Sequence, residues 1–273
     1  MKVTTLVENL AYRQGTKGEH GLSFLIETDQ KKILFDTGQS GLLVENAKTL
    51  GIDLKAIDMV IISHGHYDHT GGLKAFFEIN HHAPVYLKPR ALEDKFSRTT
   101  GHTRYIGIDK EVVKKHVSRF KTIEENTQVT SQLKIITNIQ HPYSFEKGSS
   151  AMIVHNNGKE QTDTFDDELF LVGDHDEGLI IFTGCAHNGI ANICHTAIQE
   201  TGKTLIQLVV GGTHLKSASQ ERIMQTVKTF ESFHVAQFGL CHCTGLKAFM
   251  EFSSHFPGKV SYAHVASNFQ IGQ

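Results

Sequence analysis

Residues 63–72 read SHGHYDHTGG, and this stretch decides how the rest of the chain is interpreted. It holds three histidines, His64, His66 and His69, and one carboxylate, Asp68, within six residues. The apolar run 57–62 (IDMVII) leads directly into it, which is the pattern of a buried strand with polar residues at its C-terminal end. Neutral imidazole and carboxylate are ligands that Zn²⁺, Mn²⁺ and Fe share. The stretch therefore predicts a metal site.

The spacing within this cluster allows two metal ions to share it. The four side chains alternate too quickly to share one face of a helix, so we expect a loop that wraps them around a point. His64 and His66 would bind one ion. Asp68 and His69 would bind a second ion about 3.5–4 Å away, with a hydroxide bridging the two. The alternative is a polar loop that is rich in histidine by chance, and the density of ligand types after an apolar strand disfavours it.

Three later apolar runs also end in a histidine. The run 179–184 leads to Cys185 and His187, the run 208–210 leads to His214, and the run 235–240 leads to His242. In open α/β arrangements, ligands gather at the carboxyl ends of strands. A single histidine at a strand end is more often structural, but four such strand ends predict one constellation.

Composition places the chain among ordinary globular proteins. It has 273 residues, a formal net charge of -2 and 39% hydrophobic residues, which favours neither nucleic acid nor a membrane surface as a partner. No apolar run approaches the roughly 20 residues needed to span a bilayer, and residues 1–8 lack a signal-peptide core. We therefore expect a cytoplasmic protein.

The four cysteines are too few for a disulfide scaffold in a chain of this length. We expect reduced thiols. Cys241 and Cys243 flank His242, but the chain has no second cysteine pair at the spacing of a structural zinc site. We interpret these two as small buried residues beside a ligand.

Strands and helices alternate along the chain, which predicts one α/β domain over residues 1–273. The segment at approximately 90–125 is rich in Lys and Arg and poor in apolar runs, so we interpret it as an insertion that forms a lid or recognises substrate. A peripheral helical excursion is the alternative. Strands are expected at 3–7, 22–28, 32–35, 57–62, 83–87, 132–137, 151–155, 169–172, 178–183, 204–210 and 235–240, and helices at 40–50, from about 72, and at 188–201, 219–233 and 245–256.

Several motifs carry a family resemblance. HGHYDHTGG at 64–72 resembles the signature of the metallo-β-lactamase-fold superfamily, and LFDTG at 34–38 resembles its upstream element. EHG at 19–21, TGCAHNGI at 183–190, GGTHL at 211–215 and HCTG at 242–245 resemble a narrower branch. That branch contains dihydropterin ribofuranosyl-aminobenzene-phosphate synthase-like proteins and predicted metal-dependent hydrolases. The resemblance covers nearly the whole chain and implies a four-layer αββα sandwich with a helical insertion.

The resemblance also implies which residues hold the metal ions. It places His64, His66 and His187 around one ion, and Asp68, His69 and His242 around the other. Asp36 would be a carboxylate that orients the ligand loop. Many superfamily hydrolases have a bridging Asp after a strand that ends in Thr-Gly, whereas Cys185 follows Thr183-Gly184 here. Either Cys185 binds metal as a thiolate or the site lacks a protein bridge.

The expected reaction is hydrolysis by a metal-bound hydroxide. Two divalent ions, Zn first with Mn or Fe as alternatives, would lower the pKa of a bound water to about 7. The hydroxide would attack phosphorus or a carbonyl carbon, and Asp68 or His214 would carry a proton to the leaving group. For His20 and His214, a structural role is an equal alternative.

We expect a small-molecule substrate, either a phosphoester or a pterin-linked compound. Lys88, Arg90, Arg98 and Arg104 are candidates to hold a phosphate, although ordinary surface charge is the preferred interpretation of each one alone.

Two other functions compete with hydrolysis, and the chain is also compatible with a homo-oligomer. The first is a di-iron oxidoreductase of the same fold, which is ranked lower because such members resemble a pattern with Glu at the position of His66 and carry an electron-transfer domain. The second is a sensor that retains the metal without catalysis.

Overall fold

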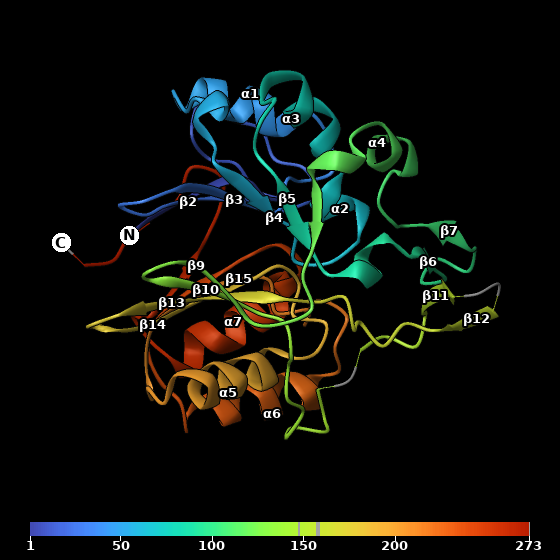
Figure 1. Ribbon diagram of the computed structural model, residues 1–273. Helices are drawn as coiled ribbons and strands as arrows, with labels where there is room; N and C mark the ends of the chain where they lie inside the picture. Colours follow the sequence, from blue (N-terminus) through green and yellow to red (C-terminus); the bar gives the residue numbers. More distant parts are fainter. Residues whose placement is uncertain (147, 157–158, 273) are drawn as a thin grey trace. The chain divides into compact units, whose positions relative to one another are not determined.

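The computed structural model describes residues 1–146, 148–156 and 159–272 (Figure 1). Contacts divide the chain into two compact units. Unit 1 comprises Met1–Glu124, Gly148–Glu168 and His264–Gln270, and unit 2 comprises Glu125–Lys147, Leu169–Ala263 and Ile271–Gln273. Each unit contains a seven-stranded sheet in the part of the chain that the structure describes. This mixed α/β architecture is consistent with the sandwich that the sequence predicts.

The sheet of unit 1 has the strand order β18-β1-β2-β3-β4-β5-β8. Neighbouring strands are antiparallel from β18 to β3 and parallel from β3 to β8. The strands are β1 (Lys2–Val7), β2 (Ser23–Glu27), β3 (Lys32–Phe35), β4 (Met59–Ile61), β5 (Val85–Leu87), β8 (Phe120–Thr122) and β18 (Asn268–Gln270).

Helices α1 (Leu42–Thr49) and α3 (Leu73–Ile79) pack on this sheet because their apolar residues lie on one face. Leu43, Ala47, Leu73 and Phe76 of these helices are fully buried in the same core cluster as Val60 of β4. The core therefore fixes β4, and with it the start of the residue 63–72 stretch.

The sheet of unit 2 has the strand order β17-β16-β15-β14-β13-β10-β9. Strands β14, β15, β16 and β17 are parallel to one another. The strands are β9 (Thr127–Thr130), β10 (Leu133–Ile136), β13 (Phe170–His175), β14 (Gly178–Thr183), β15 (Leu205–Gly211), β16 (His234–Leu240) and β17 (Val260–Tyr262).

Three amphipathic helices pack on the sheet of unit 2, namely α5 (Ile190–Thr201), α6 (Gln220–Phe230) and α7 (Gly245–His255) (Figure 1). Ser219 is the N-cap of α6, where its hydroxyl accepts a hydrogen bond from the Arg222 N–H. Gly202 is the C-cap of α5 and has a left-handed φ of 71°. Their buried faces join β14, β15 and β16 in one core cluster.

The segment at approximately 90–125 is only partly helical, which differs from the expected helical insertion. It contains α4 (Lys110–Lys115), but β8 joins the main sheet of unit 1. Strands β6 (Asp94–Ser97) and β7 (Arg104–Tyr105) join β11 (Met152–Asn156) and β12 (Lys159–Thr162) in a small sheet of order β12-β11-β6-β7. These strands are short and partly polar, so the sequence pattern gives little sign of their pairing. No helix among the described residues has the length and apolar character needed to cross a membrane.

Candidate metal centre

Residues 63–72, called the ligand stretch from here on, follow the end of β4 at Ile61. Ile62, Ser63 and His64 are fully buried, and His66 caps a four-residue helix, α2 (Tyr67–Thr70). Asp68 and His69 therefore lie on a short helix rather than on the expected loop, because a single turn is too short to show helical periodicity. The turn between His64 and His66 requires Gly65, since a Cβ there would lie 2.2 Å from the Ala91 carbonyl oxygen.

His64, His66 and His69 form a compact imidazole cluster. The ring centroid of His64 lies 4.5 Å from that of His66 and 4.2 Å from that of His69. His64 Nε2 and His66 Nδ1 are 3.0 Å apart. Burial lowers the pKa of His66 from 6.5 to about 3, so its imidazole is neutral at physiological pH.

Asp36 holds this cluster from the end of the neighbouring parallel strand β3. Its Oδ2 lies 2.7 Å from His69 Nδ1, and its carboxylate accepts hydrogen bonds from both the N–H and the hydroxyl of Ser63 at 2.7 Å. Ser63 Oγ lies 2.9 Å from His64 Nδ1. Burial by itself lowers the pKa of His69, but Asp36 and Asp68 raise it above its usual value. Asp36 thus has the contacts expected of an orienting carboxylate.

His20 joins the cluster through Asp68. Its Nε2 lies 3.2 Å from Asp68 Oδ2, and the His20 side chain is 46% exposed whereas that of Asp68 is 10% exposed. Asp68 Oδ2 also lies 3.7 Å from His69 Nε2. His20 is therefore the solvent-facing member of this group.

The donor set of unit 1 fits a divalent transition metal. It offers three imidazoles within van der Waals distance and one adjacent carboxylate, and these are the ligand types of zinc, manganese and iron sites. The Asp36–His69 bond leaves His69 Nε2 as the nitrogen that would face an ion, which is the usual carboxylate–histidine–metal arrangement.

A second cluster occupies the ends of three parallel strands in unit 2. Cys185 and His187 follow β14, His214 follows β15, and His242 follows β16. The rings of His187 and His214 have centroids 4.2 Å apart. Cys185, His187 and His242 are each at most 3% exposed. The sequence-predicted residues of each unit are therefore gathered at strand ends as expected.

Cys243 connects the turns of this second cluster. Its thiol donates to the Cys185 carbonyl oxygen, with sulfur and oxygen 3.4 Å apart, and accepts from the His214 N–H at 3.3 Å. Cys241 and Cys243 are buried, as the sequence predicts, but Cys243 also has this positioning role. Gly212 allows it, because a Cβ at residue 212 would lie 2.5 Å from the Cys243 sulfur.

Unusual backbone conformations mark the same strand ends. Asp36, Ala186, His214 and His242 have φ values of 61°, 60°, 52° and 53°. Residues other than glycine rarely adopt this left-handed region, and such residues cluster at functional sites. Asp and His enter this region more often than most side chains, so residue type gives a weak sign at three of the four positions and none at Ala186.

Three buried charges near the ligand stretch were not identified from the sequence. Lys95 Nζ lies 2.7 Å from Asp163 Oδ2 and 3.0 Å from Asp167 Oδ1, and Asp167 Oδ2 accepts a hydrogen bond from the Gly65 N–H at 2.8 Å. Lys95 lies within β6 and the two aspartates follow β12, and no local sequence pattern marks the pairing.

All four cations proposed to bind phosphate contact oxygen atoms of the protein. Lys88 reaches the Glu168 carbonyl oxygen at 3.5 Å, Arg90 pairs with Glu93 and Asp166, and Arg98 pairs with Glu160. Arg104 donates to the Tyr67 hydroxyl at 3.4 Å, and its guanidinium carbon lies 5.6 Å from the ring centroid of the same tyrosine.

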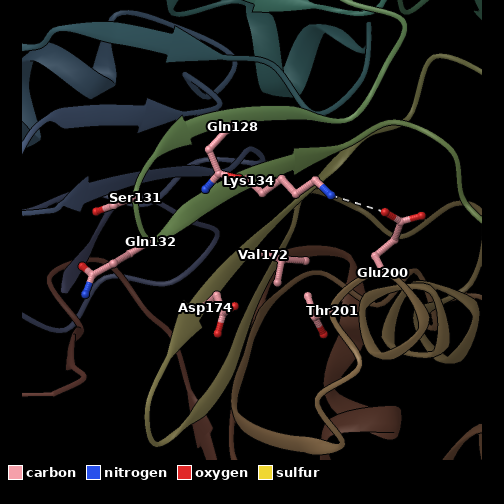
Figure 2. A pocket seen from close by; sticks show the side chains of 8 residues that line it. All are labelled: Gln128, Ser131, Gln132, Lys134, Val172, Asp174, Glu200 and Thr201. Atoms are coloured by element: carbon pink, nitrogen blue, oxygen red, sulfur yellow. Dashed lines mark hydrogen bonds and ion pairs between the residues drawn. The ribbon is translucent and has the colours of Figure 1, made fainter.

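A separate hollow of about 450 Å³ lies on unit 2 beside β9, β10 and β13 (Figure 2). Its carboxylates are engaged by lysines: Glu200 lies 3.4 Å from Lys134 Nζ, and Asp174 pairs with Lys203. The residues that line it include no histidine or cysteine. The predicted metal ligands therefore lie elsewhere.

Comparison with known proteins places the chain in a family. A family model of the metallo-β-lactamase superfamily matches residues 16–144. The chain is 33% identical over 269 residues to the 7,8-dihydropterin-6-methyl-4-(β-D-ribofuranosyl)-aminobenzene-5'-phosphate synthase of Methanocaldococcus jannaschii, covering 94% of this chain and 92% of that one. A shorter match, 35% identical over 81 residues, covers 29% of this chain and 16% of an anaerobic nitric oxide reductase flavorubredoxin of Vibrio vulnificus.

A solved structure is similar over its full length. The crystal structure of Tm1679, a metal-dependent hydrolase of the β-lactamase superfamily, superimposes with a TM-score of 0.87 and 32% sequence identity, covering 100% of both chains. The motifs, the two sheets and these relatives agree. The chain belongs to the metallo-β-lactamase superfamily, in the branch that includes the dihydropterin-linked synthase of M. jannaschii.

Proposed function

We propose that this protein is a metal-dependent enzyme that hydrolyses a small-molecule phosphoester or a pterin-linked substrate. The single observation that carries the proposal is the buried His64–His66–His69 cluster, with Asp36 bonded to His69. Such a cluster is expensive to bury without a metal, because each imidazole must satisfy two ring nitrogens in a crowded site. The similarity to a metal-dependent hydrolase and to a pterin-linked synthase supports the choice of reaction and substrate class.

We further propose that the chain binds two divalent ions. His64, His66 and His187 would bind one ion, and Asp68, His69 and His242 the other, with Cys185 as a candidate thiolate ligand. Zinc is the first choice, since imidazole, carboxylate and thiolate are its ligands in proteins. When bound, divalent ions would lower the pKa of a water and polarise the substrate.

The protein's own residues would then orient the reactants and move protons. Asp36 would hold the His69 imidazole in one tautomer, as its 2.7 Å bond requires. His214, beside His187, and Asp68, beside the exposed His20, are the candidates to pass a proton to the leaving group. Arg104 over Tyr67 would bind the anionic part of the substrate.

The reduced cysteines are consistent with a cytoplasmic location, which is part of this proposal. The flavorubredoxin match covers only 16% of that protein, and this chain has His66 where the pattern of di-iron members has Glu. We therefore prefer hydrolysis to redox chemistry.

A substrate panel tests the proposal. Purified, metal-loaded protein should hydrolyse at least one of an activated phosphodiester, a phosphomonoester, a lactone, a thioester or a pterin-linked ester. His66→Ala should abolish that turnover while leaving the circular dichroism spectrum unchanged. Equal turnover by the variant would refute the assignment, and visible absorption typical of iron with no ester hydrolysis would favour the redox alternative.

A further inference from the structure

The turn between His64 and His66 is bonded to a residue 102 positions later in the chain. The Gly65 N–H donates to Asp167 Oδ2 at 2.8 Å, and both groups are buried. On its other side the turn contacts the Ala91 carbonyl, so closely that no side chain fits at Gly65. The position of the turn is therefore fixed from two sides, and one of them is a carboxylate.

That carboxylate belongs to a buried network of three charges. Lys95 in β6 is 1% exposed, Asp167 is 1% exposed and Asp163 is 6% exposed. The Lys95 ammonium bonds Asp163 Oδ2 at 2.7 Å and Asp167 Oδ1 at 3.0 Å. Replacing buried ion pairs by apolar residues often leaves stability unchanged or improved, so stability alone is a weak reason for such a network. A role in specifying one geometry is the better explanation.

The same segment also packs against His66. Phe165 lies between the two aspartates, is 2% exposed, and has its ring centroid 6.1 Å from that of His66 in an edge-on arrangement. Its φ of 55° is in the left-handed region, and its N–H donates to Asp163 Oδ1 at 2.8 Å. A strained aromatic residue persists only where its surroundings determine its position. The segment 163–167 is therefore held in one conformation and packs against the turn between His64 and His66.

We infer that the network of Lys95, Asp163 and Asp167 positions the Gly65 turn for metal binding, with Asp167 as the residue that transmits the constraint. This inference rests on the proposed metal centre. Partners that orient metal ligands typically change metal affinity about 10- to 100-fold when they are removed. Asp167 accepts a hydrogen bond from the Gly65 N–H in the turn between His64 and His66. The corresponding oxygen of Asp163 instead accepts from the Phe165 N–H, in its own segment.

The two aspartates provide a matched pair for the test. Asp167→Ala and Asp163→Ala each leave Lys95 with one carboxylate, but only Asp167→Ala removes the acceptor of the Gly65 N–H. Zinc affinity would be measured by competition with a chelator, and folding by thermal unfolding of the metal-free proteins. We expect Asp167→Ala to weaken zinc binding about tenfold or more, and Asp163→Ala to change it by less than about threefold. Equal changes in the two variants would overturn the inference.

A second measurement does not depend on metal. Amide hydrogen exchange at Gly65 in the metal-free protein should be faster in Asp167→Ala than in Asp163→Ala, and equal protection would contradict the inference. If Asp167→Ala does not fold, the isosteric variants Asp167→Asn and Asp163→Asn are compared instead. We expect the Asp167 variant again to have the weaker zinc binding and the faster exchange at Gly65. A wild-type protein that binds none of zinc, manganese and iron would refute the proposed function, and the exchange comparison would still decide whether Asp167 positions the turn.

Discussion

Asp36 Oδ2 lies 2.7 Å from Nδ1 of His69, and both side chains are completely buried. Asp36 follows β3, and His69 lies on α2, which follows the neighbouring parallel strand β4; the same carboxylate also accepts hydrogen bonds from Ser63. A bond between a buried carboxylate and an imidazole fixes the tautomer and the ring orientation of the histidine. The relationship explains why a Phe-Asp-Thr-Gly sequence stands ahead of the histidine cluster.

Asp36→Asn should therefore weaken metal binding without unfolding the protein. The amide keeps the size of the side chain but loses the charge that the His69 bond uses, and we expect a loss of about 10- to 100-fold in zinc affinity. Chelator competition measures it. Asp58→Asn is the control, because Asp58 is an exposed carboxylate that bonds the Lys32 N–H. Equal affinity in the two variants would contradict a positioning role for Asp36.

Arg104 should determine affinity for an anionic substrate. Arg104→Gln should raise KM for a phosphoester by about tenfold, because a charge-assisted hydrogen bond contributes about 1.5–3 kcal/mol. The kcat should change little. Arg98→Gln is a matched control, since Arg98 already pairs with Glu160 at 2.7 Å. Steady-state kinetics with a charged and an uncharged substrate measure the effect of each variant on KM. An equal rise in KM for both substrates in Arg104→Gln would refute anion recognition.

Cys243 should affect turnover more than its size suggests. Cys243→Ala removes the bonds to the Cys185 carbonyl and the His214 N–H, so the turns that carry Cys185 and His214 lose a shared anchor. Small displacements of reacting groups can lower rates by up to about a hundredfold. Cys194→Ala removes another fully buried thiol from α5, in the apolar core of unit 2. Comparable kcat values in the two variants, at comparable melting temperatures, would contradict the anchoring role.

Glu146 should give the protein a pH-dependent stability unrelated to metal. It is 4% exposed, and it accepts hydrogen bonds from the N–H groups of Ala191 and Asn192 at 2.7 and 3.2 Å, at the start of α5. Burial raises the pKa of its carboxyl above 4.5. A raised folded-state pKa means that this contribution to stability is complete below about 4.5 and is lost as the pH rises through the folded-state pKa.

Glu146→Gln should remove that part of the pH dependence. The amide oxygen can still accept from the helix N-terminus, and the amide group can donate to Thr226, whose hydroxyl lies 3.1 Å from Glu146 Oε1. Thermal unfolding of the metal-free proteins from pH 4 to pH 8 measures the effect. The difference in melting temperature, variant minus wild type, should increase as the pH rises, and parallel curves would show that Glu146 does not titrate there.

The elements that carry the candidate ligands could be predicted from the sequence because each begins with a buried apolar run. The runs before His64, His187, His214 and His242 became β4, β14, β15 and β16, and their parallel pairing places the ends of each unit's strands at one edge. Periodicity also located α5, α6 and α7, because each has a full apolar face.

Other features had no local signal. The pairs that Lys95 makes with Asp163 and Asp167 join residues separated by 68 and 72 positions, and nothing in the surrounding sequence marks either partner. Strands β6, β7, β11 and β12 are short and partly polar, so their pairing depends on tertiary context. The left-handed backbone at His214 and His242 follows from the turns that hold them rather than from their residue type.

The metal content of the purified protein tests the central claim most directly. Elemental analysis after gentle purification should find about two transition-metal ions per chain, by the logic of a two-metal site. His66→Ala and His187→Ala should each lower that number, because both residues are proposed metal ligands, whereas the control His81→Ala should not. No more than trace metal in the wild-type protein, or full metal content in both ligand variants, would contradict the proposed metal centre.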